Sequence, residues 1–358
     1  MSLPAPAFIN AIGTAVPDHD IHHAFIDWAR AQLIDPRAAK LFDRMAARSG
    51  ITHRWSVLDR APGNGSPVEA GGFYGGDRPG TAARMAIYAE AAPELALEAI
   101  TALADQTALD GITHLVVASC TGFVAPGIDQ IIARRLGLAA DVERLLVGFM
   151  GCYAAITGLR SARHIVRSQP EARVLVVCVE LSSLHLQEAD SVEPLLAMLQ
   201  FGDGAAAALV TGRPEGFEIG SPFATTLPES DALIRWAITD HGFAMHLSGE
   251  VPARIAAGLA DPAFAEAALG GRSPEMIDGW AVHAGGRSIL DAVEHALALD
   301  PAALADSRGV LADVGNMSSA TLMFVLGRLL AGPRIDNGVA LAFGPGLAAE
   351  GFGFRSSS

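Results

Sequence analysis

Residues 144–160 read RLLVGFMGCYAAITGLR, and this stretch predicts a β-strand, a tight turn and an α-helix in succession. The apolar run Arg144–Met150 is typical of a buried strand, Gly151 permits a sharp turn, and Tyr153–Arg167 has the pattern of a helix. Such a junction exposes the residue at the turn, here Cys152, and the positive end of the helix dipole favours the reactive thiolate. The stretch alone does not decide between a nucleophile and a small core residue, because cysteine is often simply buried.

Short apolar runs alternate with amphipathic segments on both sides of this junction. Further strands are expected at His114–Ser119, Arg173–Leu181, Gly204–Thr211, Gly279–His283, Gly338–Phe343 and Gly351–Arg355, and further helices at Ile128–Leu136, Gly286–Leu297 and Met317–Leu330. Strands separated by helices predict an α/β fold with helices on the faces of a sheet. Because the second half of the chain repeats the plan of the first, we expect two similar halves, residues 1–212 and 213–358, joined by the segment 212–228.

Composition narrows the class of protein. The 358 residues suffice for one large domain or two packed halves, and 51% hydrophobic with 18% charged residues indicate a globular chain. The net charge of −14 argues against nucleic-acid binding, so an anionic substrate would need a local group of basic residues. Three cysteines, Cys120, Cys152 and Cys178, do not indicate a disulfide framework, and we expect a cytoplasmic protein. The sequence shows neither a signal-peptide pattern nor an apolar run of about 20 residues that could span a membrane.

Two further segments carry residues that could act with Cys152. His283 ends a predicted strand and is followed by Gly285 and Gly286, which let a backbone or a ligand approach closely. Asn316 precedes a predicted helix and could simply cap it. Either residue alone would more often be structural than catalytic. Together, cysteine, histidine and asparagine at strand–helix junctions form a known chemical set, in which histidine pairs with the thiolate and both partners can donate hydrogen bonds to an oxyanion.

These residues resemble the catalytic triad of type III polyketide synthases, the chalcone synthase-like family. Cys152, His283 and Asn316 match that triad in order and in local context, and the phrase GNMSSAT, which contains Ser318, is close to diagnostic. The resemblance covers about residues 8–355. It implies a thiolase-like fold, with two α/β halves in a five-layered α-β-α-β-α arrangement, and a homodimer.

Other family motifs shape the cavity and the entrance. The segment FGDGA begins with Phe201 at the position of the family's gatekeeper phenylalanine. Most of the family's glycine-rich loop is present as Phe343, Gly344, Pro345 and Gly346. Arg44 and Arg48 match two basic residues at the mouth of the family's CoA tunnel, while Leu41 stands where a third is usual. They lie one turn apart on a predicted helix, and arginine suits phosphate, although a solvated helix face would be the simpler interpretation without the resemblance.

Four positions depart from the family pattern and bear on the substrate. Met245 stands at a second gatekeeper-like position, Ala125 replaces the methionine that the partner subunit usually contributes, His185 aligns with a cavity threonine, and Cys120 lies near the active-site floor. Flexible or small apolar walls at Met245 and Ala125 favour a fatty acyl starter over a flat aromatic one. His185 and Cys120 could be cavity walls or ordinary core residues.

The resemblance implies an acyltransferase that loads an acyl-CoA starter on Cys152 and extends it with malonyl-CoA by iterative decarboxylative condensation. Cyclisation would then give a pyrone, a resorcinol or a related product. No metal or bound cofactor is expected, because the CoA thioesters are substrates. Two alternatives are a ketoacyl-ACP synthase III-like enzyme, which makes one condensation on the same fold, and a non-catalytic scaffold. The starter, the number of extensions, the cyclisation and the use of an acyl carrier protein are not fixed by the sequence.

Overall fold

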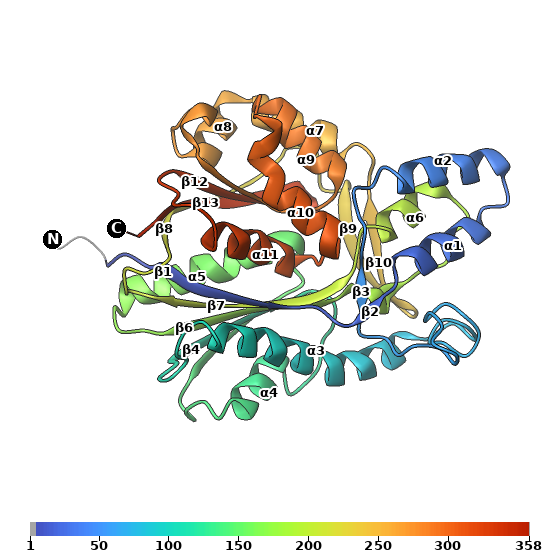
Figure 1. Ribbon diagram of the computed structural model, residues 1–358, viewed down its shortest axis with the longest axis horizontal. Helices are drawn as coiled ribbons and strands as arrows, with labels where there is room; N and C mark the ends of the chain where they lie inside the picture. The colour runs from blue at the N-terminus through green and yellow to red at the C-terminus, as the bar shows by residue number, and fades with distance from the viewer. Residues whose placement is uncertain (1–4, 358) are drawn as a thin grey trace.

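A computed structural model describes residues 5–357 and shows a nine-stranded sheet in the order β11-β12-β13-β8-β1-β7-β6-β4-β5 (Figure 1). Its strands are β1 (Phe8–Ala15), β4 (His114–Ser119), β5 (Glu143–Gly148), β6 (Val174–Leu181), β7 (Asp203–Thr211), β8 (Phe217–Thr226), β11 (Gly279–Val282), β12 (Gly338–Gly344) and β13 (Ala348–Ser356). The sheet consists of two halves, because β1 and β8 share only the pairs Phe8–Glu218 and Ile9–Phe217. Two small sheets pair β2 (His19–Asp20) with β3 (Trp55–Ser56) and β9 (Ile234–Thr239) with β10 (Gly242–Leu247).

The helices form three layers around the two halves of the sheet. They are α1 (His22–Gln32), α2 (Pro36–Ala46), α3 (Thr81–Ala104), α4 (Ile128–Arg135), α5 (Ala154–Ser168), α6 (Val192–Met198), α7 (Val251–Ala260), α8 (Pro262–Leu269), α9 (Arg287–Ala296), α10 (Ala305–Val314) and α11 (Ser319–Leu330). Helices α3 and α4 cover the outer face of the first half, and α7 to α10 lie outside the second half (Figure 1). Helix α5 contacts β4, β6 and β13, and α11 contacts β1, β7, β11 and β12, so both lie between the halves. The predicted α/β fold and its five layers are confirmed.

Strand β6, VLVVCVEL, shows how the sequence specifies these layers. Every residue of β6 is buried, as expected for a central strand covered on both faces. Leu175 and Val177 pack in the core under α3, whereas Val176 and Cys178 pack in the central core with α5 and α11. The alternation follows from the period of two along a strand. Glu180 is the one charged residue in the strand, and it lies near the candidate site.

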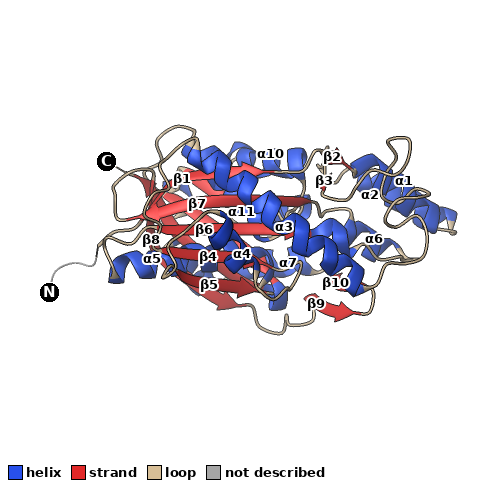
Figure 2. Cartoon of the chain, turned by 90° about the horizontal axis from the view of Figure 1, so that it is seen from below, coloured by secondary structure: helices blue, strands red, loops and turns tan. Residues whose placement is uncertain are grey.

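Most predicted elements agree with the structure within a few residues, but the joining segment differs. Residues 212–228 were expected to be a connection, and they contain β8, which lies between β1 and β13 in the sheet. A strand can occupy this place because β8 pairs along its length with β13. The remaining helices and the β9–β10 hairpin gather at one end: α1, α2 and α6 lie there, away from both termini, in Figures 1 and 2. None of the helices described has the length and apolarity needed to cross a membrane.

Candidate active site

Cys152 lies in the sharp turn between β5 and α5. Phe149 (φ 58°) and Gly151 (φ 77°) both adopt the left-handed region, and a 3-10 turn over Gly151–Tyr153 leads into α5. A side chain at Gly151 would place its Cβ 2.4 Å from Pro345, so only glycine fits there. The predicted strand–turn–helix junction is therefore confirmed.

Cys152 is partly buried. Burial raises the pKa of this thiol to about 12, while nearby hydrogen-bonding side chains of Ser318 and Asn316 act in the opposite direction. The lower thiol pKa expected from the helix position is thus wrong for the isolated thiol, because desolvation outweighs the helix dipole and the hydrogen bonds. A thiolate here needs a proton acceptor close by.

His283 follows β11 and is 2% exposed. Neither ring nitrogen of His283 has a hydrogen-bond partner among residues 5–357. Burial lowers the pKa of this imidazole to about 3, so it is neutral when alone. A Cβ on Gly285 would lie 3.2 Å from the imidazole Cδ2 and 3.4 Å from Nε2, so a glycine leaves room beside the ring. The free nitrogens make His283 available to a thiol or a substrate carbonyl.

Asn316 connects the cysteine turn with the histidine turn. Its Nδ2 donates to the carbonyl of Gly285 at 3.1 Å, and its Oδ1 accepts from the backbone N–H of Ser318 at 2.8 Å. Helix α11 begins at Ser319 with Ser318 as its N-cap, so Asn316 does not cap that helix. Ser318 itself has φ 46°, a strained conformation of the kind found at functional sites. The structure therefore places Cys152, Asn316 and Ser318 together, and it ties Asn316 to the turn that follows His283.

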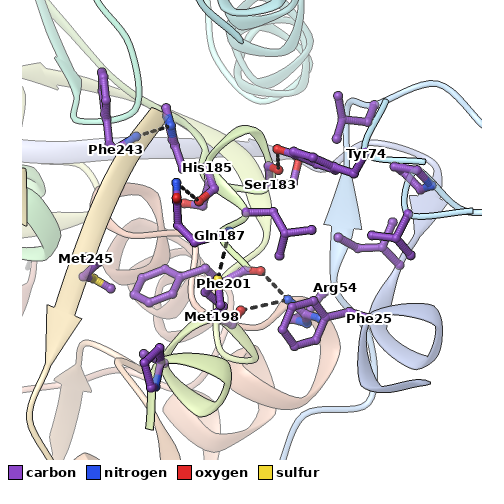
Figure 3. A pocket seen from close by; sticks show the side chains of 18 of the residues that line it. Phe25, Arg54, Tyr74, Ser183, His185, Gln187, Met198, Phe201, Phe243 and Met245 are labelled. Atoms are coloured by element: carbon purple, nitrogen blue, oxygen red, sulfur yellow. Dashed lines mark hydrogen bonds between the residues drawn. The ribbon is translucent and has the colours of Figure 1, made fainter. Parts of the chain in front are cut away.

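Phe201 is held beside Asn316 through the backbone. The two residues form a parallel bridge, in which Asn316 N–H donates to Gln200 at 2.8 Å and Gly202 N–H donates to Asn316 at 3.0 Å. The Phe201 side chain lines a largely apolar space that we call the inner cavity (Figure 3). Phe201 therefore both pairs with Asn316 through the backbone and lines this cavity.

The inner cavity has a volume of about 90 Å³. It is lined by Ile21, Phe25, Arg54, Leu58, Ser66, Pro67, Val68, Tyr74, Ser182, Ser183, His185, Leu186, Gln187, Pro194, Ala197, Met198, Phe201, Trp236, Phe243 and Met245. This volume is smaller than that of a typical ligand pocket, roughly 300–1,000 Å³, so a long acyl chain can enter only if lining side chains move. Met245 and His185, expected as possible walls, both line it.

His185 is a neutral wall residue. Its Nε2 lies 2.7 Å from the Thr121 carbonyl, and its Nδ1 accepts from the Phe243 backbone at 3.0 Å. Burial lowers the pKa of this imidazole to about 4, and the ring stacks on Phe243 with centroids 4.2 Å apart. With both nitrogens occupied, His185 shapes the cavity and has no free group for proton transfer.

Cys120 contacts the turn that carries Cys152. Its sulfur accepts from the Gly151 N–H at 2.9 Å, and its own N–H donates to Glu180 at 2.9 Å. Glu180 also accepts from Thr121 and Ser319, and burial raises the pKa of this carboxyl to about 7. The sequence analysis missed Glu180, although a single acidic residue in an otherwise apolar strand was a usable signal.

A second hollow, the outer pocket, lies on the other side of the Gln200–Phe201 segment. It is lined by Met45, Arg48, Ser49, Leu196, Leu199, Gln200, Arg287, Ser288 and Asp291. Arg48 lines this pocket as expected for a tunnel mouth, whereas Arg44 is exposed and outside the lining. Arg287 was not anticipated; its Nη1 donates to the Arg48 carbonyl at 3.2 Å. The approach of Gln200 also explains Gly286, where a Cβ would lie 2.0 Å from the glutamine Oε1.

The glycine-rich loop, Phe343–Gly346, packs directly on the turn that carries Cys152. A Cβ at Gly344 would lie 2.7 Å from the Tyr153 ring and 3.3 Å from the Cys152 nitrogen, and Pro345 contacts Gly151. Phe343 is buried in the outer core of the second half, and Gly346 adopts φ 69°. Ala125 lies apart from both hollows, on the surface of the single chain.

Known proteins share the sequence pattern and the fold of this chain. The models for the N-terminal and C-terminal domains of chalcone and stilbene synthases match residues 3–214 and 218–358. The chain belongs to this family, the type III polyketide synthases, which are acyltransferases that form carbon–carbon bonds by Claisen condensation.

Individual relatives agree with this assignment. The chain is 32% identical to an "Alpha-pyrone synthesis polyketide synthase-like Pks18" of Mycobacterium tuberculosis, over 98% of this chain and 92% of that protein. It is 36% identical to a bisdemethoxycurcumin synthase of Oryza sativa, over 98% and 93%. Among solved structures, PKS-I from the brown alga Ectocarpus siliculosus superposes with a TM-score of 0.89 at 28% identity, over 99% of both chains. The C-terminal type III polyketide synthase domain of Steely1 from Dictyostelium superposes with 0.88 at 26% identity, over 99% of this chain and 100% of that chain.

Proposed function

We propose that this type III polyketide synthase loads a starter acyl group on Cys152 and extends it repeatedly with malonyl-CoA. The observation that carries the proposal is the meeting of the Cys152 thiol with Asn316, whose amide is bonded to the turn that follows a buried histidine with two free nitrogens. Separately, burial keeps the thiol and the imidazole neutral, since each charge alone is costly. A proton transfer from Cys152 to His283 creates two opposite charges that stabilise each other. The thiolate therefore forms as part of an ion pair.

The loading step transfers the acyl group from CoA to the enzyme. The thiolate attacks the thioester carbonyl, the carbon–sulfur bond to CoA breaks, and the departing CoA takes the proton from His283. Malonyl-CoA then loses CO2 as its carboxyl carbon–carbon bond breaks, and the electron pair moves to the thioester oxygen as an enolate. His283 and Asn316 donate hydrogen bonds to that oxygen. One such donor contributes about 3–4 kcal/mol to a transition state.

The extension step forms the new carbon–carbon bond. The enolate carbon attacks the acyl–Cys152 carbonyl, and the thiolate leaves. The product is a β-ketoacyl-CoA, which returns to Cys152 for the next round. These steps need no metal ion and no bound cofactor. Phe201, which lines the inner cavity and pairs with Asn316 through the backbone, would orient the malonyl group. The arginines of the outer pocket would bind the CoA phosphates.

The proposed starter is a fatty acyl group, and the proposed product is a pyrone or a resorcinol. The inner cavity supports this starter because most of its lining is apolar, with Met245 and Leu186 among the flexible walls. The printed name of the mycobacterial relative, α-pyrone synthesis, supports the pyrone. A single-condensation enzyme of the ketoacyl-ACP synthase III kind would instead stop after one extension.

A panel of acyl-CoA starters incubated with malonyl-CoA and analysed by mass spectrometry tests the proposal. We expect products with at least two added two-carbon units from free CoA esters. Cys152→Ala should abolish them, whereas Cys178→Ala, which removes a thiol from the central core, should keep them. Products with one extension only, or a requirement for an acyl carrier protein, would support the alternative enzyme. Absence of malonyl-CoA decarboxylation by the unaltered protein would support a non-catalytic scaffold.

The proposed assembly is a cytoplasmic homodimer formed along β5. This strand is at the edge of the sheet, and Leu145 and Leu146 on it are 43% and 42% exposed. Phe123, in the loop that carries Ala125, is 45% exposed nearby, and its ring centroid lies 5.5 Å from that of Phe149 at an interplanar angle of 48°. Exposed apolar residues beside an open strand edge are typical of an interface. Light scattering should show a dimer for the unaltered protein and a monomer for Leu146→Glu; an unchanged mass would contradict this surface.

A further inference from the structure

One face of helix α2 carries basic and apolar side chains that are exposed to solvent. The opposite face, with Ala39, Phe42 and Ala46, is buried against α1 and α6. Exposed residues recur on the first face at spacings of three and four, which place side chains on one side of a helix. We call this set the basic face, and its members are Arg37, Lys40, Leu41, Arg44, Met45 and, just after the helix, Arg48.

The four cations of the basic face form no ion pair with other residues of the described chain, 5–357. The acidic residues of the same helix end are engaged elsewhere. Asp43 pairs with Arg30 of α1 at 3.1 Å, and Asp35 caps α2 by accepting from the Arg37 backbone N–H at 3.0 Å. The whole chain has a net charge of −14, and its single lysine, Lys40, lies on this face. The basic face is therefore a local positive surface that attracts anions.

Apolar side chains are exposed beside these cations. Ile34, in the turn between α1 and α2, is 95% exposed, and Leu41 and Met45 are 39% and 46% exposed. Helices α1 and α2 lie at the end of the molecule away from both termini (Figures 1 and 2). Basic residues next to exposed aliphatic ones on a surface helix are typical of segments that bind a membrane interface.

We propose that the basic face binds the surface of an anionic lipid bilayer, with Ile34 and Leu41 entering the headgroup layer. The cations would bind lipid phosphates, and each one near an anionic surface strengthens binding roughly fivefold. A bilayer fits this surface better than a folded acidic protein does. Ile34 projects from a turn at the end of the molecule, where fluid headgroups can surround it, whereas a stable protein interface needs a matching surface of roughly 800 Å² on each partner.

The position of the basic face connects it to the outer pocket. Met45 and Arg48 belong to the face and also line that pocket. A fatty acyl-CoA is amphipathic and partitions into bilayers, so a membrane-bound enzyme would meet such a starter beside the pocket. This consequence rests on the proposed function, whereas lipid binding itself rests on the charges and the exposed apolar side chains alone.

Sedimentation with sucrose-loaded vesicles tests the proposal without turnover. The vesicles contain phosphatidylcholine alone or phosphatidylcholine with about one third phosphatidylglycerol, in about 0.05 M or about 0.5 M NaCl. We expect the unaltered protein to bind the anionic vesicles at low salt at least roughly tenfold more strongly than the neutral ones. Most of this binding should be lost at high salt, because salt screens exposed charges.

Single substitutions locate the binding surface. Arg37→Gln and Lys40→Gln should each lower binding to anionic vesicles roughly threefold to fivefold, and Ile34→Ser should lower it by a similar factor. The matched controls are Arg134→Gln, at an exposed arginine of α4, and Met276→Ser, at a methionine that is 56% exposed. Both controls should bind like the unaltered protein. Thermal unfolding shows whether each variant is folded.

The proposal is overturned if the unaltered protein binds anionic and neutral vesicles equally or binds neither. It is also overturned if Ile34→Ser, or both charge variants, bind like the unaltered protein. An acidic acyl carrier protein is the second probe: if it binds in a manner that requires Arg37 and Lys40 while vesicles do not bind, the basic face serves a protein partner instead. Failure of the proposed function is a separate result, because the unaltered protein would then release no CO2 from malonyl-CoA, whatever the vesicle data show.

Discussion

The outer pocket and the inner cavity both contain arginine, but in opposite surroundings. In the outer pocket, the Arg287 side chain is 52% exposed and lies 3.5 Å from Asp291, so water and a neighbouring carboxylate share its charge. In the inner cavity, Arg54 is 2% exposed, and one of its nitrogens has no partner in the part of the chain described. The two hollows meet at Gln200 and Phe201.

The proposed function assigns CoA binding to the outer pocket and contact with the acyl chain to the inner cavity. An exposed arginine attracts phosphate weakly and in a salt-dependent way, so several are needed to hold CoA. A buried donor forms a stronger hydrogen bond and is costly when unpaired. The boundary between the two hollows is the Gln200–Phe201 segment, which pairs with Asn316 through the backbone.

The largest effect on activity should come from a change at Asn316, beside the boundary between the two hollows. Asn316→Ala removes a donor to the enolate oxygen and the bond to Gly285, and we expect malonyl-CoA decarboxylation to fall by about 10²–10³-fold. Release of CO2 measures the rate. Asn337→Ala is the control, because that residue lies in a loop before β12, and it should keep normal activity. A rate above one tenth of normal in Asn316→Ala would show that the boundary does not stabilise the enolate.

The second prediction concerns the ionisation of the Cys152 thiol. Burial raises the pKa of the Cys152 thiol to about 12, so a thiol without an acceptor stays protonated at neutral pH and ionises about tenfold more for each unit that the pH rises. In His283→Gln the acceptor is lost, and alkylation by iodoacetamide should show this steep rise between pH 6 and pH 9. In the unaltered protein, transfer to His283 should make alkylation at least about tenfold faster at pH 7 and flatter with pH.

The matched variant for that experiment is His295→Gln, which changes an exposed histidine at the end of α9. It should react like the unaltered protein. If the alkylation rate rose equally steeply with pH in the unaltered protein and in His283→Gln, the ion pair would be contradicted, and His283 would act on the substrate alone.

The sequence predicted the α/β class and the turn at Cys152 because both depend on local patterns, whereas the five-layered fold was implied by the family resemblance. A fully apolar strand such as β6 and the glycine turn before Cys152 are visible in a few consecutive residues. The missed β8 lies in a segment with Gly, Pro and Ser, and it is a strand only because β13 provides a pairing partner. Such long-range pairing is invisible to local composition.

The candidate site was predictable only in part for a related reason. The triad residues stand in recognisable motifs, but Arg54, Trp236 and Arg287 stand in none. Their roles come from segments distant in sequence that meet around a hollow, such as Arg54 against the carbonyls of residues 198 and 201. The thiol pKa also failed as a local prediction, because burial by the whole fold outweighs the helix end.

A third prediction concerns Arg287, the exposed arginine of the outer pocket. Arg287→Ala should raise the KM for malonyl-CoA by roughly threefold to tenfold and leave kcat nearly unchanged, because an exposed cation contributes modestly to binding. Malonyl-N-acetylcysteamine, which lacks the phosphates, should show no change. Arg44→Ala is the control on α2, since this exposed residue is outside the pocket. An equal change with both thioesters would mean that Arg287 acts on the fold of the pocket instead of on phosphate.

The smallest effect should come from the shape of the inner cavity. Met245 and Trp236 face each other across the β9–β10 hairpin, and both line the cavity. Met245→Phe replaces a flexible wall with a rigid ring, so long starters should lose about two- to fivefold in kcat/KM while short ones keep theirs. Malonyl-CoA decarboxylation should not change, because the outer pocket and the triad are untouched. An equal loss of kcat/KM for starters of all chain lengths would mean that Met245 affects catalysis itself. The proposed distinction between an outer pocket that binds CoA and an inner cavity that contacts the acyl chain would then not hold at β10.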